Sequence, residues 1–342
     1  MRASMFSELG KAKFDHLLPL VDSVPRDPML CMALEGNRPG QVFVDRPANP
    51  SVALIWTGME YAYLIGEPAD HSAEVVQVVE QVILPALQEA GLDFITIFPD
   101  GVSPAAVQAW FPKRRPVSFG VNSFTFERNR FERLRLQARP LPPGYERVKL
   151  DRQTLDQAAC QGIREDILFC WESLERFEAL GLGYSIASPQ GEVVSACYAI
   201  GYGAEAFHID IWTHHDHRRR GLARQAAIAF VEEGLQKDRT IYWINDAPNI
   251  ASRRLAEGVG FVYVGDLATL DIPVYPHTFH LGLAEHFASY LGLYRQAGEL
   301  YDEAFAIRAG NSEAYAQAAS VWRQAGDAAK AEMYRQKAAA AK

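Results

Sequence analysis

The stretch AEAFHIDIWTHHDHRRRGLA, residues 204–223, contains an alternating apolar run that ends in a turn, after which a helix begins. Strict alternation of apolar and polar residues predicts a half-buried β-strand. The two faces of that strand would carry an aliphatic set and a polar, titratable set: Phe207, Ile209, Ile211 and Thr213 against His208, Asp210 and Trp212. A titratable face opposite an aliphatic one marks a candidate site.

The arginine-rich turn that follows this strand begins a predicted helix, because LARQAAIAFVEEGLQK repeats its apolar residues at helical spacing. Unpaired backbone N–H groups cluster at a helix N-terminus, and the helix dipole favours an anion there. Gly221 and the small Ala223 would let a ligand approach the backbone closely. The turn is therefore predicted to bind phosphate groups.

Arg218, Gly221 and Ala223 match an R/Q-x-x-G-x-G/A signature after a strand, and in this the sequence resembles the GCN5-related N-acetyltransferases (GNAT superfamily). That family holds the pyrophosphate of acetyl-CoA on this loop. TIYWIN (240–245), which reads as a buried strand, and NIASRRLAEGVGF (249–261) resemble its closing segments. The resemblance implies that acetyl-CoA contacts the following residues: Ile211, Trp212, Thr213, Arg218, Arg219, Arg220, Gly221, Leu222, Ala223, Asn249 and Ser252.

The predicted strand also carries the candidates for the catalytic base. An alkylammonium keeps its proton at neutral pH, so a carboxylate or an imidazole must remove it before the nitrogen can attack. His208 and Asp210 lie where the family usually places this base. His208 has the more suitable unperturbed pKa, whereas Asp210 could act through water, hold His208 in one tautomer or bind the cationic amine. Both could instead be ordinary polar residues of a half-buried sheet.

The general acid is where the sequence departs from the family. A tyrosine seven residues after the asparagine commonly protonates the departing thiolate, and here that position holds Ala256. Ser252, Tyr242 and water remain candidates, and a thiol with an ordinary pKa near 8.5 can also leave without strong help.

Backbone N–H groups of residues 211–213 are expected to stabilise the charge that develops on the thioester oxygen. The Trp212 side chain either lines the pocket for the thioester or packs in the hydrophobic core.

Composition narrows the class of protein. With 342 residues, of which 49% are hydrophobic, the chain should form about two or three domains. A net charge of −8 argues against a nucleic-acid surface over the whole chain. Residues 1–20 lack the apolar core of a signal peptide, and no apolar run reaches about 18 residues, which predicts a soluble, cytoplasmic protein without a membrane partner.

Neither cysteines nor histidines indicate a metal site. The four cysteines are far apart and form no C-x-x-C pair, so neither a zinc site nor a disulfide framework is suggested. The cluster HHDH (214–217) could supply ligands, but no second cluster completes a site. No metal is therefore expected.

The first 140 residues repeat the order of strands and helices expected around residue 210, with helices over 6–21 and 72–91, the second kinked or divided at Pro85. Glu67 and Asp70 stand where the other half has three arginines, and carboxylates there would repel a pyrophosphate. The N-terminal half thus resembles a degenerate second copy, as in two-domain family members such as the zwittermicin A self-resistance type. PLPPG (140–144) marks the boundary.

Beyond residue 275 the sequence becomes alanine-rich, and Gly292, Ala297 and Ala304 recur 34 residues later. That interval resembles the tetratricopeptide (TPR) repeat. Two copies do not make a free-standing solenoid, so this tail should dock as a plain helical hairpin or bind a partner protein, including a second copy of this chain. The predicted fold class is α+β: a degenerate GNAT-like domain (1–140), a catalytic GNAT domain (141–275) and a TPR-like helical tail (276–342).

Two functions of different classes agree with these patterns. The first is an acetyl-CoA-dependent N-acetyltransferase that acts on a primary amine of a small molecule by direct attack, with antibiotic self-resistance as one role. The second is a catalytically silent coenzyme A sensor or protein-interaction module, which the missing tyrosine at Ala256 and the added helices would suit. No motif in the sequence identifies the acceptor.

Overall fold

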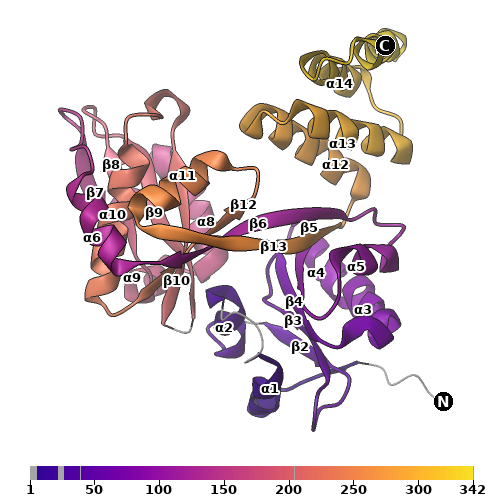
Figure 1. The fold of residues 1–342 in the computed structure, drawn as a ribbon, viewed down its shortest axis with the longest axis horizontal. Coiled ribbons are helices and arrows are strands. Elements are labelled where there is room, and N and C mark those ends of the chain that lie inside the picture. Colours follow the sequence, from indigo (N-terminus) through magenta and orange to yellow (C-terminus); the bar gives the residue numbers. More distant parts are fainter. Residues whose placement is uncertain (1–5, 22–26, 39, 204, 342) are drawn as a thin grey trace. The chain divides into compact units, whose positions relative to one another are not determined.

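A computed structural model describes residues 6–21, 27–38, 40–203 and 205–341 of the chain (Figure 1). Ala204, the first residue of the stretch quoted above, lies outside the described residues, as do residues 1–5, 22–26, 39 and 342. The described chain forms two compact units, each made of three segments. The first contains Met1–His71, Phe98–Val102 and Phe119–Thr269, and the second contains Ser72–Ile97, Ser103–Ser118 and Leu270–Lys342.

The first unit contains an antiparallel run of strands near the N-terminus. In this run the order is β1 (Ser7–Glu8), β2 (Gln41–Val44), β3 (Val52–Trp56) and β4 (Tyr61–Gly66). Every residue of β3 is buried, which agrees with its unbroken apolar sequence. The strands expected in this part of the sequence are therefore present.

The helix expected over residues 6–21 is wrong in its first half. Ser7 and Glu8 form β1 and pair with Val44 and Phe43, and Gly10 precedes a 3₁₀ helix, Lys11–Leu17, that continues into α1 (Leu18–Val21). Backbone pairing with β2 outweighs the helical spacing of the side chains here. A short helix, α2 (Pro28–Leu34), follows and is capped by the Asp27 side chain.

The first unit also contains a five-stranded sheet that carries the predicted site. Its order is β11 (Thr240–Tyr242), β10 (Ala206–Thr213), β9 (Val193–Gly203), β8 (Gly183–Ala187) and β7 (Glu146–Lys149). All neighbouring strands are antiparallel except β10 and β11, which are parallel. A register shift in the β9–β10 ladder falls between His208 and Ile209.

Helices lie against both faces of this sheet. The face that carries Phe207 is covered by α10 (Leu222–Gln236), and the rings of Phe207 and Phe230 are 5.7 Å apart. The face that carries His208 is covered by α2, because a Cβ atom at Gly201 would lie 2.5 Å from the Met29 sulfur and 3.7 Å from the His208 Cβ. Two further helices precede β8, namely α8 (Gln161–Trp171) and α9 (Leu174–Leu180).

The single strand expected over residues 240–245 is divided in the structure. Thr240–Tyr242 forms β11 beside β10, whereas Ile244–Asp246 forms β12 and pairs with β6 (Val117–Phe126). Trp243, between them, is buried. The chain therefore leaves β10 after Tyr242, and no strand of the described chain pairs with that edge of β10 from Ile209 to Thr213.

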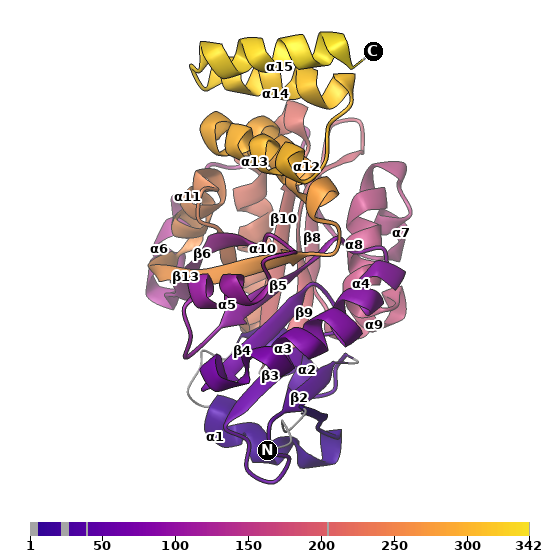
Figure 2. The same ribbon diagram turned by 90° about the vertical axis from the view of Figure 1, so that its right-hand side faces the viewer.

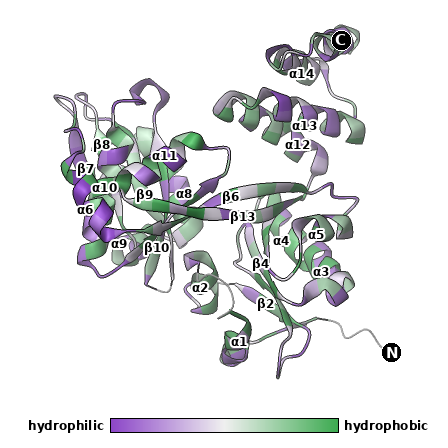
Figure 3. Cartoon of the chain, in the orientation of Figure 1, coloured by the Kyte–Doolittle hydropathy of each residue, from purple (hydrophilic) through white to green (hydrophobic). Residues whose placement is uncertain are grey.

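The remaining helices and the last strand of the first unit meet at Gly260. Helix α11 (Ile250–Val259) ends at Gly260, whose φ is 115°, and β13 (Phe261–Pro273) begins directly after it. A Cβ atom at Gly260 would lie 2.7 Å from Cα of Phe131, in α6 (Arg128–Leu136). Only glycine fits this close contact and this backbone conformation. Helix α6 is otherwise strongly hydrophilic (Figure 3).

The second unit contains the long N-terminal helix and the C-terminal helices. Residues 72–89 form α3 (Ser72–Val78), a π-helical segment (Val79–Ile83) and α4 (Leu84–Glu89), so the helix changes its winding just before Pro85 as expected. Helix α5 (Pro104–Trp110) packs near α3. Strand β5 (Phe94–Pro99) pairs with the end of β13, and Thr96 donates a hydrogen bond to Asp271 at 2.7 Å.

The C-terminal region is helical, as expected, and its neighbouring helices pack in pairs (Figure 2). Its elements are α12 (Pro276–His286), a π-helical segment (Phe287–Leu291), α13 (Tyr294–Ile307), α14 (Ser312–Gln324) and α15 (Ala328–Ala340). Gly292 and Gly326 both adopt positive φ at helix ends, so the 34-residue interval relates α13 to α15. Gly326 separates α14 from α15.

Among the described residues, every helix is too short or too polar to cross a lipid bilayer.

Candidate active site

From Phe207 to Asp210, the two faces of β10 separate as the alternation predicted. Phe207 and Ile209 are buried in the same hydrophobic core as α10. His208 is 4% exposed and its ring contacts Tyr242, while Asp210 is exposed. The hydroxyl of Tyr198, on β9, donates to Asp210 at 3.2 Å. The polar face of β10 therefore carries one buried and one accessible titratable group.

The free edge of β10 exposes backbone donors beside Asp210. Parallel pairing with β11 ends at His208 and Tyr242. The His214 N–H donates to Val194 O on the β9 side, and N–H groups alternate along a strand, so those of Ile211 and Thr213 face the free edge. The Ile211 N–H already donates to the Asp210 carboxylate at 2.7 Å, so a ligand carbonyl would have to replace that bond at Ile211. This edge can pair with an extended amide-containing chain.

The predicted phosphate loop has the conformation of an anion site. Arg219 and Gly221 both adopt left-handed φ angles, 63° and 80°, immediately before α10. Within the described chain, the first turn of this 15-residue helix has no side-chain cap, and no heavy atom lies within 4 Å of the place where a Gly221 Cβ would stand. Its first N–H groups have no intrahelical partner and can bind an anion. The residues present thus fit a pyrophosphate.

The three arginines are exposed and arranged around this loop. Arg218 donates to Thr213 O at 3.2 Å, which ties the loop to the end of β10. Arg220 donates to the Tyr145 hydroxyl at 2.7 Å and to Asp216 O at 3.2 Å. Among the other predicted contacts, Leu222 is buried under the loop and Ala223 is half-buried in the first turn of α10.

The predicted downstream contacts lie at the start of α11. Asn249 caps α11, and its side-chain oxygen accepts from the Ser252 N–H at 3.0 Å. The Ser252 hydroxyl accepts from the Trp243 indole at 3.2 Å. Ala256, where a tyrosine was expected, is fully buried. Trp212 is half-buried, packs against the core and contacts the His214 ring.

Sequence reasoning missed a tyrosine and a second carboxylate beside Asp210. The Tyr198 hydroxyl donates to Asp166 of α8 at 2.8 Å as well as to Asp210. Partial desolvation and the nearby Asp210 charge raise the pKa of Asp166, although the hydrogen bond from Tyr198 opposes this. Burial and both carboxylates raise the pKa of Tyr198, which keeps its proton. No motif marks these residues, because only the β9–β10 register and the α8 packing bring them together.

The His208 ring is buried and lacks a partner at one nitrogen. Its Nδ1 atom has no hydrogen-bond partner within the described part of the chain. Burial lowers the pKa of His208, and the charges of Asp27 and Asp210 only partly oppose this. The imidazole is therefore neutral at neutral pH.

This lowered pKa makes stability depend on pH. His208 binds its proton more tightly in the unfolded chain than in the folded chain. Its contribution to the free energy of unfolding is therefore fully present above about pH 6.5, and it is lost as the pH falls below the pKa of His208 in the unfolded chain. We expect wild type to lose more stability than His208→Gln between about pH 7 and pH 5, by about 1.4 kcal/mol for each unit of pKa difference. Urea unfolding across this range measures it.

The matched control for this experiment is His215→Gln, because the His215 side chain is 72% exposed. The free energy of unfolding of His215→Gln should change with pH as that of wild type does. Equal slopes for wild type and His208→Gln would contradict the assignment of a neutral, buried imidazole.

The HHDH cluster does bring ligand atoms together. One ligand atom each of His214, His215 and Asp216 lie within 4.8 Å of one another. His215 and Asp216 are exposed, and the two side chains approach to 3.3 Å.

On the other half of the chain, Glu67 and Asp70 are exposed in the segment between β4 and α3, which includes the 3₁₀ turn Pro68–His71.

Known proteins share both the sequence pattern and the fold. A family model described as GNAT acetyltransferase matches residues 19–270. An uncharacterized N-acetyltransferase of Bacillus subtilis strain 168, YdfB, is 22% identical over 267 residues, which cover 75% of this chain and 95% of the relative.

Solved structures show the same fold at low sequence identity. A GCN5-related N-acetyltransferase-like protein of Streptococcus suis 89/1591 aligns with a TM-score of 0.59 at 21% identity, covering 77% of this chain and 99% of that one. A tandem GNAT protein from the clavulanic acid biosynthesis pathway aligns with a TM-score of 0.51 at 14% identity, covering 79% and 98%.

The family match spans most of the chain and includes β10, the loop at Gly221 and α11. The chain belongs to the GNAT acetyltransferase family and is an N-acetyltransferase.

Proposed function

We propose that this enzyme transfers the acetyl group of acetyl-CoA to a primary amine of a small molecule. The observation that carries the proposal is the placement of three features on one strand-loop-helix segment: an exposed carboxylate at Asp210, a free β10 edge, and the left-handed Gly221 loop at the start of α10. A cofactor whose thioester, amide-containing arm and pyrophosphate follow one another along its length fits these three features in that order.

Named residues would hold acetyl-CoA in this arrangement. The N–H groups at the start of α10, with Arg218, Arg219 and Arg220, would bind the pyrophosphate, because the helix N-terminus and the guanidinium groups both attract negative charge. The free edge from Ile211 to Thr213 would pair with the pantetheine amides. Asn249 and Ser252 would contact the cofactor from the start of α11.

Asp210 is the group that we propose as the base, with Tyr198 and Asp166 positioning it. The acceptor ammonium gives one proton to Asp210, directly or through water, and then to solvent. The nitrogen lone pair forms a C–N bond to the acetyl carbon while the C–S bond breaks and its electron pair stays on sulfur. The second N–H proton neutralises the thiolate, directly or through water. His208, neutral and buried, would position this face of β10.

The proposal extends to the rest of the chain. Residues 1–140 would form the degenerate domain that shapes the acceptor site, residues 141–275 the catalytic domain, and residues 276–342 a TPR-like tail that docks or binds a partner or a second copy. The reaction would take place in the cytoplasm, need no metal, and serve antibiotic self-resistance if the acceptor is an antibiotic amine.

The test is acetyl transfer by the full chain. The purified protein is first titrated with coenzyme A in a calorimeter and then incubated with acetyl-CoA and a panel of small amines, while free thiol is measured. We expect coenzyme A to bind and thiol release to require an amine, with the acetylated amine as the second product. Binding without transfer to any amine would favour the alternative, a catalytically silent coenzyme A sensor, which Ala256 at the usual tyrosine position supports.

A further inference from the structure

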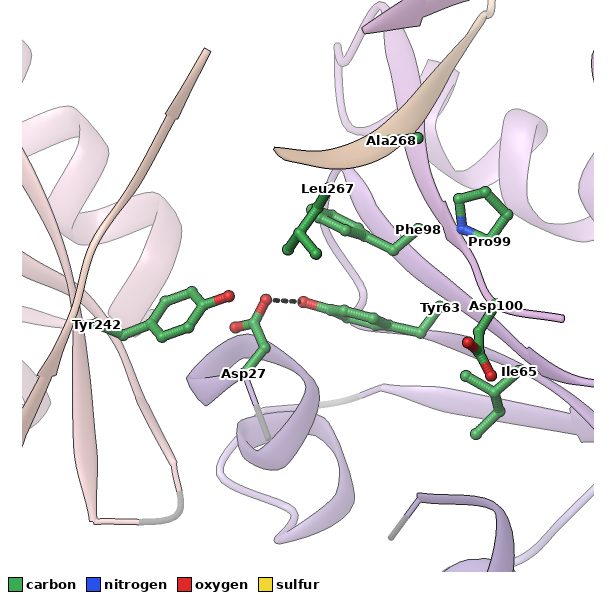
Figure 4. Close-up of a pocket in the computed structure, with 9 residues that line it drawn as sticks. All are labelled: Asp27, Tyr63, Ile65, Phe98, Pro99, Asp100, Tyr242, Leu267 and Ala268. Atoms are coloured by element: carbon green, nitrogen blue, oxygen red, sulfur yellow. Dashed lines mark hydrogen bonds between the residues drawn. The ribbon is translucent and has the colours of Figure 1, made fainter. Parts of the chain in front are cut away.

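A pocket in the first compact unit lies beside the proposed active site. Its wall includes Asp27, Tyr63 of β4, Phe98 of β5, Tyr242 of β11 and Leu267 of β13, and all of its lining residues belong to that unit (Figure 4). It encloses about 620 Å³, counted together with its open mouth. Sequence reasoning gave no role to most of these residues, which come from five distant segments of the chain.

A buried carboxylate forms one end of the pocket. Asp27 is 4% exposed, and its two oxygens accept hydrogen bonds from the Met29 N–H at 2.7 Å and from the Tyr63 hydroxyl at 2.6 Å. Within residues 6–21, 27–38, 40–203 and 205–341, no lysine or arginine forms an ion pair with it. Buried carboxylates are normally paired with a cation, since burial of an isolated charge is costly. Within the described chain, this end of the pocket therefore offers a buried carboxylate without a lysine or arginine partner.

Aromatic rings complete a cation site around this carboxylate. Tyr63 stacks on Phe98, with ring centroids 5.1 Å apart and planes 17° apart. The hydroxyls of Tyr63 and Tyr242 are both directed toward Asp27 (Figure 4). Aromatic faces attract ammonium groups, and an exposed second carboxylate, Asp100, also lines the pocket. The described lining contains no lysine or arginine, so an anion would be repelled.

The pocket adjoins the strand that carries the proposed base. Tyr242 is the register partner of His208, and the two rings are 5.5 Å apart. Asp210 follows two residues further along β10, about 7 Å at the usual rise of a strand. A chain that enters the site with its reacting nitrogen at Asp210 can thus extend past Tyr242 toward Asp27.

We propose that this pocket binds a second, non-reacting ammonium group of the acceptor, so that the acceptor class is aliphatic di- or polyamines. The apolar Leu267 and Ile65 side chains of the pocket suit the methylene chain, and Asp27 holds the distal charge. This inference deepens the proposed acetyl transfer and rests on it for the identity of the ligand as acceptor.

The experiment compares a diamine with a monoamine of equal chain length. Butane-1,4-diamine and butylamine are each titrated into the full chain saturated with coenzyme A, in wild type and in Asp27→Asn. Asparagine keeps the size and the helix-capping ability of aspartate but removes its charge. We expect the diamine to bind wild type at least about tenfold more tightly than the monoamine, and Asp27→Asn to abolish that difference without changing monoamine affinity.

Two further variants keep the test decisive. Asp238→Asn removes an exposed carboxylate of the first unit outside the pocket and should retain the full preference for the diamine. If Asp27→Asn does not fold, as judged by thermal unfolding, the exposed Asp100→Asn replaces it and should lower diamine affinity about threefold. Equal affinities of wild type for both amines, or an equal loss of both in the variant, would overturn the proposal.

The outcome is distinguishable from failure of the proposed function. A diamine that binds in an Asp27-dependent manner to a protein that does not bind coenzyme A would support the pocket and overturn acetyl transfer. Coenzyme A binding and acetyl transfer to butylamine as efficient as to the diamine would support the enzyme and overturn the pocket.

Discussion

Replacement of Gly221 with glutamate should raise the Kd of coenzyme A at least about a hundredfold. Gly221 has a φ of 80° and open space at its Cβ position, at the N-terminus of α10. A carboxylate there would meet the pyrophosphate, and two like charges about 4 Å apart repel each other by about 4 kcal/mol at an effective dielectric constant of about 20. That energy corresponds to about a thousandfold in Kd, and salt screening reduces it. Calorimetric titration of Gly221→Glu with coenzyme A measures the effect.

The chain offers a matched control in Gly191. It too has a positive φ, 83°, and no heavy atom of the described chain within 4 Å of its Cβ position, but it lies in the turn between β8 and β9. Gly191→Glu therefore adds the same charge and a similar backbone strain away from α10. We expect it to bind coenzyme A within about twofold of wild type, since a distant exposed charge is largely screened. Similar affinities for the two variants would remove the loop from the proposed site.

Replacement of Asp210 with asparagine should lower kcat for acetyl transfer by about 10²- to 10⁴-fold, the usual contribution of a general base. Asparagine preserves the size of the side chain and can still accept from Tyr198 and from the Ile211 N–H, so the β10 edge should keep its geometry. Coenzyme A affinity should stay close to that of wild type. Steady-state thiol release and calorimetry on the same preparation separate these two quantities.

The comparison with His208 decides which titratable residue of β10 acts as the base. His208→Gln should lower kcat less than about tenfold, because a buried, neutral imidazole positions the strand without taking a proton from the acceptor. Asp238→Asn is the carboxylate control and should be fully active. Full activity of Asp210→Asn together with inactivity of His208→Gln would reverse the assignment.

The sequence alone located the strand, the loop and the helix to which we assign the proposed cofactor contacts. Alternation from Phe207 to Thr213 and helical spacing after Gly221 depend only on neighbouring residues, so local pattern is enough to predict them. The sequence also marked Gly221 as a place where a ligand could approach the backbone, and the structure adds that its φ is left-handed, a conformation that glycine adopts readily. The helix expected over residues 6–21 failed because the pairing of Ser7 and Glu8 with β2 is a contact between distant residues.

Tertiary structure alone determined the surroundings of the titratable residues on the polar face. An unperturbed pKa favours His208 as the base, but packing of α2 and Tyr242 buries this ring and lowers its pKa. The partners of Asp210, namely Tyr198 and Asp166, and the aromatic walls around Asp27 come from segments that no local pattern links. Desolvation and long-range proximity are properties of the folded chain, whereas periodicity and loop conformation are already present in the order of its residues.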